Sequence, residues 1–229
     1  MNCETGALHP TLWRTCRILA HVNRLACLKV IFEHPSSTVS DVAGSLSVPV
    51  NQASTFLRAL QARGLIRAQR HSRWVRYAPF PDPLVPGSRV LLKALRQALL
   101  ARKDSEADIK HTLTGFTHLR RLAILARLQT FRTASAEALA VATQISLPAV
   151  SRHLSKLAAR RLVRHADQQW RLAPPPDALA RTLLRLIQTG EQEVRKQPGK
   201  TRRALSADAA KDLNAAKEQP LGPSRRRKG

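Results

Sequence analysis

An internal repeat constrains the fold of this chain more than any other feature of its sequence. Residues 24–67 align without a gap to residues 121–164, at a constant shift of 97 and with 12 identities in 44 positions. A two-residue shortening then aligns residues 76–84 with residues 171–179, so the two copies share their ends as well. Such self-similarity predicts two small units of one fold rather than a single large domain.

The first two helices of each copy are predicted from apolar periodicity and a capping pattern. Apolar residues with helical spacing cover residues 23–34 in copy one and 118–131 in copy two. A second helix is expected after Thr38, because Asp41 three positions later completes a capping box. Ser135 is the weaker counterpart of Thr38 in copy two.

A third helix is predicted near Pro49 in copy one and near Pro148 in copy two, since proline is tolerated in the first turn of a helix. It runs to Gly64 or to Arg161. Short segments typical of paired strands follow over residues 65–80 and 162–174, the first with a polar turn at His71–Ser72. A helix-turn-helix followed by a small β-hairpin is a winged helix.

Another helix is expected after each hairpin. Residues 88–103 are apolar on more than one side, and the helix over 177–192 has one apolar stripe, formed by Leu179, Leu183, Leu184 and Ile187. Helices of this kind pack against a partner helix. Two arrangements stay open: a homodimer through helices 88–103 and 177–192, or an intramolecular pseudo-dimer of the two copies.

The predicted fold class is mainly α with small β-hairpin wings, as two tandem winged helix-turn-helix domains and a disordered basic C-terminal tail. From residue 195 the chain has eleven Lys and Arg against three acids, a composition typical of disorder. The predicted parts are winged-helix domain 1 (10–86), a connecting and packing helix (87–104), winged-helix domain 2 with a C-terminal packing helix (105–192) and the tail (193–229).

The net charge restricts the class of partner. Thirty-nine Lys and Arg against 15 Asp and Glu give a formal charge of +24. A charge this large repels itself in a compact fold and indicates a polyanionic partner. Nucleic acid is the first candidate and an anionic membrane surface the second. No run approaches 18 apolar residues, so no membrane span is expected.

Helical angles predict which side chains of the third helices face outward. At about 100° per residue, Val150, Leu154 and Leu157 form the buried stripe of copy two. The residues predicted to contact DNA are Asn51, Gln52, Ser54, Thr55 and Arg58 in copy one, and Pro148, Ser151, Arg152, Lys156 and Arg160 in copy two. Asn, Gln and Arg can form bidentate contacts with base edges.

Three arginines of the first hairpin, Arg70, Arg73 and Arg76, are interpreted as contacts to phosphates or a minor groove. The second hairpin is less basic and includes Asp167, so it is expected to contribute less. The two copies also differ at recognition positions, where Asn51, Gln52 and Thr55 stand against Pro148, Ala149 and Arg152, so two unlike half-sites are predicted.

Catalysis is not expected from this sequence. Ser151 and His153 resemble a nucleophile–base pair, yet they lie about 200° apart around one helix and cannot form a hydrogen-bonded dyad. Copy one has Phe56 where His153 stands, which favours a packing role. The sequence has no glycine-rich phosphate loop and no paired carboxylates, so the protein is predicted not to be an enzyme.

The segments "LSVPVNQASTFLRALQARGLI" and "TQISLPAVSRHLSKLAARRLV" resemble the recognition helix and turn of ArsR-type winged-helix transcription regulators. The resemblance covers about 24–84 and 121–179, and MarR-type regulators share much of it. Copy two keeps the family's Ser-x-His-Leu but has Arg161 where glycine is expected. Many members sense metals through Cys, His, Asp or Glu on the second helix and the helix after the wing. The second helices here contain neither Cys nor His.

No cofactor and no metal are predicted. Asp108 and His111 have a spacing that could begin a metal site, but a solvated pair is the favoured interpretation. Cys16 and Cys27 are expected in the core as small apolar residues. Cys3 brings the cysteines to an odd number, from which no disulfide framework follows.

The leading hypothesis is a repressor-like transcription regulator that binds double-stranded DNA through two recognition helices and wings. The alternative is an architectural or chromosome-handling protein, or an RNA-binding protein, with tandem winged helices and little sequence specificity. Copy two could also serve protein contacts without binding DNA. The absence of an apolar N-terminal run predicts a cytoplasmic protein, nucleoid-associated if bacterial.

Overall fold

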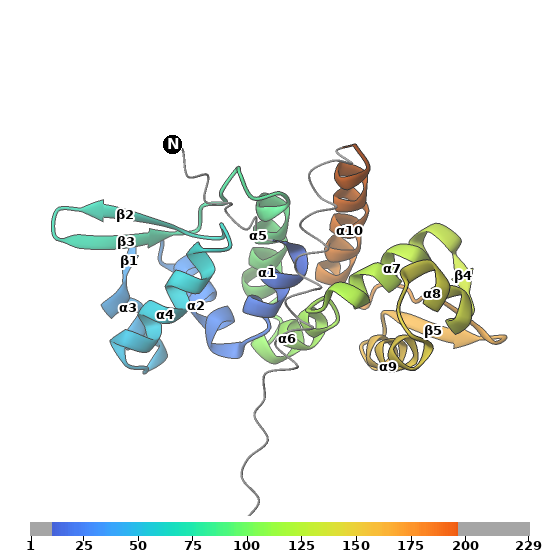
Figure 1. The fold of residues 1–229 in the computed structure, drawn as a ribbon. Coiled ribbons are helices and arrows are strands. Elements are labelled where there is room, and N and C mark those ends of the chain that lie inside the picture. Colours follow the sequence, from blue (N-terminus) through green and yellow to red (C-terminus); the bar gives the residue numbers. More distant parts are fainter. Residues whose placement is uncertain (1–10, 197–229) are drawn as a thin grey trace, which may run out of the picture. The chain divides into compact units, whose positions relative to one another are not determined.

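The computed structural model describes residues 11–196 of the chain, with side-chain surroundings through residue 189 (Figure 1). The described part is mainly helical and contains two three-stranded antiparallel sheets. The predicted tail over 193–229 lies outside the described residues, except that the last helix continues to Lys196 instead of ending at 192. No described helix is long and apolar enough to cross a membrane.

The two copies have the same order of helices and strands, as the repeat predicts. Copy one consists of α2 (Val22–Glu33), β1 (Ser37–Thr38), α3 (Val39–Leu46), α4 (Val50–Gln61), β2 (Arg67–His71) and β3 (Trp74–Ala78). Copy two consists of α7 (Leu119–Phe131), β4 (Thr133–Ala134), α8 (Ala136–Thr143), α9 (Leu147–Ala158), β5 (Val163–Ala166) and β6 (Gln169–Leu172). The sheet orders are β1-β3-β2 and β4-β6-β5.

The predicted helix starts are confirmed by their capping contacts. The Thr38 hydroxyl accepts from the Asp41 amide at 3.3 Å, while the Asp41 carboxylate accepts from the Thr38 amide at 2.8 Å. In copy two only half of this box is present, since Ser135 accepts from the Ala138 amide at 3.2 Å. Position 138 is an alanine, with no carboxylate to return the bond.

The sheets differ from the prediction in two details. Each gains a third strand of two residues, β1 or β4, which is too short to show alternation in the sequence. The turn of the first hairpin lies at Ser72–Arg73 and not at His71–Ser72, because His71 pairs with Trp74. Ser72 adopts a φ of 55°, so the polar residue still carries the left-handed conformation of the turn.

Two helices that the sequence did not reveal extend the repeat toward the N-terminus. α1 (Leu12–Leu19) precedes α2, and α6 (Glu106–Thr114) precedes α7. The shift of 97 places residues 12–19 on residues 109–116, so α1 and α6 are counterparts. These counterparts pack against one another, and α6 also packs against α2. Residues 106–114, predicted only as the start of domain 2, thus form a helix that contacts copy one.

The helices after the hairpins join the same region. α5 (Ser88–Arg96) continues into a π-helical turn over Gln97–Ala101, and α10 spans Ala178–Lys196. The predicted apolar stripe of α10 is confirmed, because all four of its members are buried, namely Leu179, Leu183, Leu184 and Ile187. A Cβ on Gly87 would lie 2.9 Å from Leu186 Cδ2, which shows how closely the start of α5 approaches α10.

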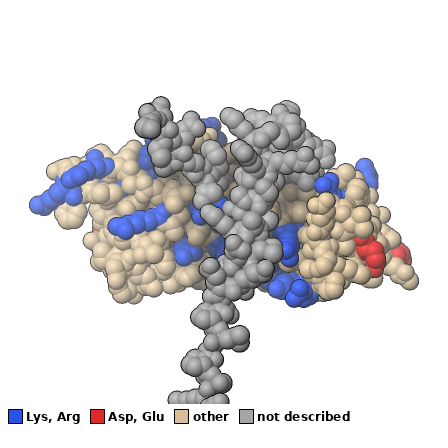
Figure 2. All heavy atoms as spheres, viewed as in Figure 1, with Lys and Arg blue, Asp and Glu red and all other residues tan. Residues whose placement is uncertain are grey.

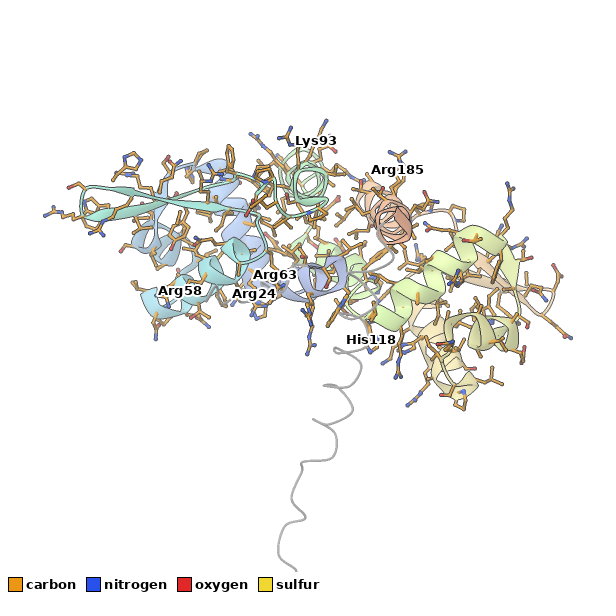
Figure 3. All side chains as sticks on the ribbon, turned by 45° about the horizontal axis from the view of Figure 1, so that its top comes forward. Arg24, Arg58, Arg63, Lys93, His118 and Arg185 are labelled. Atoms are coloured by element: carbon orange, nitrogen blue, oxygen red, sulfur yellow. The ribbon has the colours of Figure 1, made fainter. Side chains whose placement is uncertain are left out.

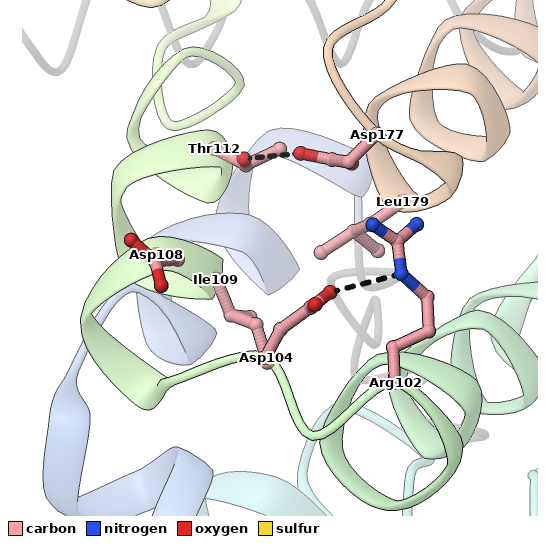
Figure 4. Close-up of a pocket in the computed structure, with 7 residues that line it drawn as sticks. All are labelled: Arg102, Asp104, Asp108, Ile109, Thr112, Asp177 and Leu179. Carbon is pink, nitrogen blue, oxygen red and sulfur yellow. Dashed lines mark hydrogen bonds and ion pairs between the residues drawn. The ribbon is translucent and has the colours of Figure 1, made fainter.

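A small hollow of about 170 Å³ lies where α6 meets the start of α10 (Figure 4). The Thr112 hydroxyl donates to the Asp177 carboxylate at 2.7 Å, and the same carboxylate accepts from the Ala180 amide at 2.6 Å. Asp104 lies 3.5 Å from Arg102 Nε. These carboxylates are engaged in helix capping and an ion pair, so the hollow is a structural junction.

The left-handed residue after the third helix gives a stability prediction. Gly64 has a φ of 63° and its counterpart Arg161 a φ of 55°. This conformation costs a non-glycine residue about 1–2 kcal/mol, partly offset by glycine's greater freedom in the unfolded chain. We therefore expect Arg161→Gly to raise the free energy of unfolding by about 0.5–1 kcal/mol, measured by urea denaturation with circular dichroism.

The matched change in copy one is expected to act in the opposite direction. A Cβ on Gly64 would lie 2.7 Å from Val85 Cγ2 and 2.8 Å from Asp82 Cβ. In Gly64→Ala the new Cβ overlaps Val85 and Asp82, and an alanine must also adopt the left-handed backbone conformation. We expect this substitution to lower the free energy of unfolding by about 2 kcal/mol. Equal effects of the two substitutions would contradict the argument.

Candidate nucleic-acid interface

The outward face of α4 is set by its buried face. Four apolar side chains of α4 are directed into the core: Ala53, Phe56, Leu57 and Leu60. The predicted DNA-contacting residues lie on the other side, where Asn51, Gln52, Thr55 and Arg58 are exposed and Ser54 is half-buried. The structure therefore places these five side chains on one accessible surface of the helix.

The same surface of α9 carries fewer polar groups. Pro148, Ser151, Arg152 and Lys156 are exposed, as the helical angles predict. Ala149, which the sequence suggested as a recognition position opposite Gln52, is only 4% exposed and belongs to the core. That part of the prediction is wrong, because an alanine has no polar group to hold it at the surface. Arg152 is thus the main hydrogen-bonding side chain near the start of this face.

Hydroxyl groups on both helices donate to their own backbone. The Thr55 hydroxyl donates to the Asn51 carbonyl at 3.0 Å, and the Ser151 hydroxyl donates to the Leu147 carbonyl at 3.0 Å. Each hydroxyl oxygen keeps its acceptor capacity. These residues can therefore accept hydrogen bonds from a ligand while the arginines beside them donate.

Arg160 differs from the other predicted contact residues. Its Nε donates to the Thr114 hydroxyl at 2.6 Å, and its Nη1 donates to the Lys156 carbonyl at 2.7 Å. The bond to Thr114 joins the segment after α9 to the end of α6, and the bond to Lys156 stays within the end of α9. The structure gives Arg160 an internal partner, whereas Arg58 and Arg152 have exposed side chains.

The first hairpin is long, basic and accessible. Arg70, Arg73 and Arg76 are all exposed, and Figure 2 shows Lys and Arg side chains gathered along this hairpin. Arg76 is steadied by donating to the Ser36 carbonyl at 3.0 Å, and Arg70 by donating to the Ser72 carbonyl at 3.2 Å. Trp74 is 48% exposed and lies 5.1 Å from the Arg73 guanidinium carbon. The hairpin thus presents cationic groups and one aromatic ring.

The second hairpin is shorter and carries less charge at its tip. Asp167 and Gln168 form its turn, with φ values of 53° and 57°. Two positive φ values are typical of a type I′ turn. The Trp170 ring packs against His165 at 4.7 Å between centroids, so the aromatic side chain of this hairpin is half-buried.

A ring on the inner side of α4 and one on the inner side of α9 each contact a histidine. These histidines, His21 and His118, stand just before α2 and α7. The Phe56 and His21 ring centroids lie 5.5 Å apart in copy one, and those of His153 and His118 lie 4.9 Å apart in copy two. Burial, followed by the charges of His118 and Arg121, lowers the pKa of His153 from 6.5 to about 4. His153 therefore packs as a neutral ring, and the Ser151 hydroxyl bonds to the backbone instead.

The remaining candidate groups have structural surroundings. Cys16 and Cys27 are confirmed in the core, where burial raises the pKa of both thiols, that of Cys27 to about 12. Asp108 accepts from the Ser105 hydroxyl at 2.6 Å at the start of α6. The part of the chain that the structure describes has no group of three or more His, Cys, Asp or Glu that could hold a metal ion. Cys3 lies outside that part.

Sequence reasoning missed a set of arginines between α1, α2 and the end of α4. Arg24 and Arg63 are identical in the other copy, as Arg121 and Arg160, so the alignment already contained the signal. It was not recognised because α1 itself was not predicted, and Arg17 of that helix faces the pair.

Two comparisons with known proteins identified no relative of this chain. No protein-family model matches the chain. A search of curated proteins found no significant match. The function is therefore proposed from the side chains of this chain and their surroundings.

The half-buried His153 gives a pH prediction. His153 has a lower pKa in the folded chain than the usual 6.5, so the unfolded chain binds more protons between about pH 6.5 and 4. Stability is then present above pH 6.5 and falls as the pH decreases through this range. We expect His153→Phe, which copies Phe56, to lose less melting temperature than the wild type between pH 7.5 and 5.

The pKa of His21 is also lowered, by burial and then by the charges of Arg24 and Lys110, so part of the pH dependence should remain in the variant. The comparison is made by thermal denaturation in buffers of equal ionic strength. Identical slopes for the two proteins would show that His153 is accessible to protons in the folded state.

Proposed function

We propose that the chain is a repressor-like transcription regulator that binds double-stranded DNA through two tandem winged-helix domains. The observation that carries the proposal is the accessible row Asn51, Thr55 and Arg58 on α4, which leads to a basic hairpin. The repeat places an equivalent helix and hairpin in copy two. A formal charge of +24 supports a polyanionic partner.

In the proposed complex α4 and α9 are recognition helices, each lying in a major groove. Asn51 and Gln52 can read base edges, while Arg58 and Arg152 can contact guanine or phosphate. Arg70, Arg73 and Arg76 of the first hairpin contact the backbone or an adjacent minor groove. The order of elements and the resemblance to ArsR-type regulators support this assignment of roles.

The proposed arrangement is an intramolecular pseudo-dimer. Counterpart helices of the two copies, α1 and α6, pack against each other within one chain. Because Thr55 and Arg152 occupy equivalent positions with different side chains, the two half-sites are proposed to be unlike.

A second candidate function is an architectural protein with little sequence specificity. The observation that favours it is the weak recognition face of α9, where Pro148 has no hydrogen-bonding side chain and Ala149 is buried. Such a helix can position a backbone without reading many bases. The two functions differ in the ratio of specific to random binding.

The first test is the loss of binding on truncating one recognition arginine. After selection of bound fragments from random DNA, Arg58→Ala and Arg152→Ala are each expected to weaken binding to the selected site about tenfold or more. Arg185→Ala, an exposed arginine of α10, is the matched control and should have little effect. Affinities are measured by fluorescence anisotropy over a series of salt concentrations.

The selected fragments and the titrations together distinguish the transcription regulator from the architectural protein. An asymmetric two-part motif, with Arg58→Ala and Arg152→Ala each affecting one half, supports the regulator. Enrichment without a motif, together with a steep salt dependence, supports the architectural function. A salt dependence shallow enough to imply only one or two phosphate contacts would refute both.

A further inference from the structure

A second cationic feature lies beside the first helix of the chain. A hollow of about 510 Å³ opens between α1, α2 and the end of α4. Among the residues that the structure describes, its lining consists of Trp13, Arg14, Arg17, Ile18, Arg24 and Arg63, of which four are arginines and none is acidic. Figure 3 shows Arg24 and Arg63 close together beside α1. The hollow has the volume of a small-molecule site.

The repeat provides an internal reference for this cluster. The shift of 97 places Arg24 on Arg121 and Arg63 on Arg160. In copy two both are held by threonines: Arg121 Nη2 donates to the Thr117 hydroxyl at 2.7 Å, and Arg160 Nε donates to the Thr114 hydroxyl at 2.6 Å. The copy-two pair therefore has neutral internal acceptors.

Copy one has lost both acceptors. Arg17 stands at the position of Thr114, and Ala20 stands at the position of Thr117. Each substitution removes a hydroxyl, and the first also adds a positive charge. A pair of arginines that bonds to threonine hydroxyls in copy two is thus surrounded by further arginines in copy one.

The consequence is visible in the hydrogen bonds of the pair. Arg24 Nη1 donates to the Ile18 carbonyl at 3.1 Å, but the Nε groups of Arg24 and Arg63 are buried and have no hydrogen-bond partner among residues 11–189. In copy two the Nε of Arg160 is satisfied, although that of Arg121 is not. Burial, and then the charge of Arg14, lowers the pKa of Arg63. Leaving buried charged donors unpaired is costly.

We propose that this hollow binds a small free anion that carries two or more phosphate groups, with Arg17, Arg24 and Arg63 as its ligands. Several guanidinium groups around one cavity match several phosphates, because each guanidinium can donate two parallel hydrogen bonds to phosphate oxygens. The Trp13 ring and Ile18 form an apolar wall, which suits a ligand with an organic part such as a nucleoside di- or triphosphate.

The geometry favours a small anion over the backbone of a duplex. Arg24 and Arg63 are half-buried and line a concavity, whereas the arginines assigned to DNA contact, Arg58 and Arg152, are exposed on outward helix faces. A free polyphosphate can enter a hollow that a rigid double helix can only cover. The inference does not depend on the proposed function, since pyrophosphate binding is measured without DNA.

The experiment is calorimetric titration of the full chain with inorganic pyrophosphate and with ATP at about 150 mM salt, where surface charges are screened beyond about 8 Å. The decisive variant is the double substitution Arg17→Thr and Ala20→Thr, which gives copy one the acceptors of copy two and so should preserve the fold. Arg185→Thr changes the charge equally on α10 and is the matched control. Circular dichroism and melting temperature check folding.

The wild type and Arg185→Thr are expected to bind pyrophosphate saturably near one per chain, and the double variant at least tenfold more weakly. No saturable binding by the wild type, or equal loss in the double variant and the control, would overturn the proposal. So would a double variant that binds pyrophosphate normally but duplex DNA less well, because the hollow would then serve the DNA backbone. Should the double variant misfold, Arg24→Gln replaces it with the same expected outcomes.

Discussion

The buried leucines of α4 and α9 set the orientation of every other side chain on those helices. Leu57 and Leu60 in copy one, and Leu154 and Leu157 in copy two, are fully buried. With one stripe fixed in the core, the remaining positions are assigned by angle alone. The accessible face, its arginines and its hydroxyls therefore follow from a packing constraint that the two copies share.

The same constraint explains which parts of the fold were predictable. The order of helices and hairpins, the Thr38 capping box and the α10 stripe could be predicted because each has a local signal of period or cap. α1 and α6 were not predicted, although Ser105 and Asp108 at the start of α6 have the same capping spacing as Thr38 and Asp41. They are stabilised by packing against one another, and such a contact between distant segments leaves little trace in local periodicity.

The exposed residues of the candidate interface could be predicted from the same helical angles. The prediction was wrong for Ala149, a residue with a small side chain. Angle placed Thr55, Arg58 and Arg152 at the surface correctly. Ala149 was assigned to a recognition position because it aligns with Gln52. Its side chain is a single methyl group, which fits into the core, and Ala149 is buried. The role of Arg160 was also not predictable from its charge, because the Thr114 hydroxyl that holds it lies 46 residues away.

The equivalent arginines show how the two copies have diverged in their electrostatics. In copy two, Arg121 and Arg160 donate hydrogen bonds to threonine hydroxyls, and the hairpin tip carries Asp167. In copy one the same arginines face Arg17, and the hairpin is basic. The first hairpin thus exposes more positive charge than the second, whereas Arg160 of copy two is bonded to the end of α6. The two copies therefore differ in their electrostatics while both keep the buried leucines of their third helices.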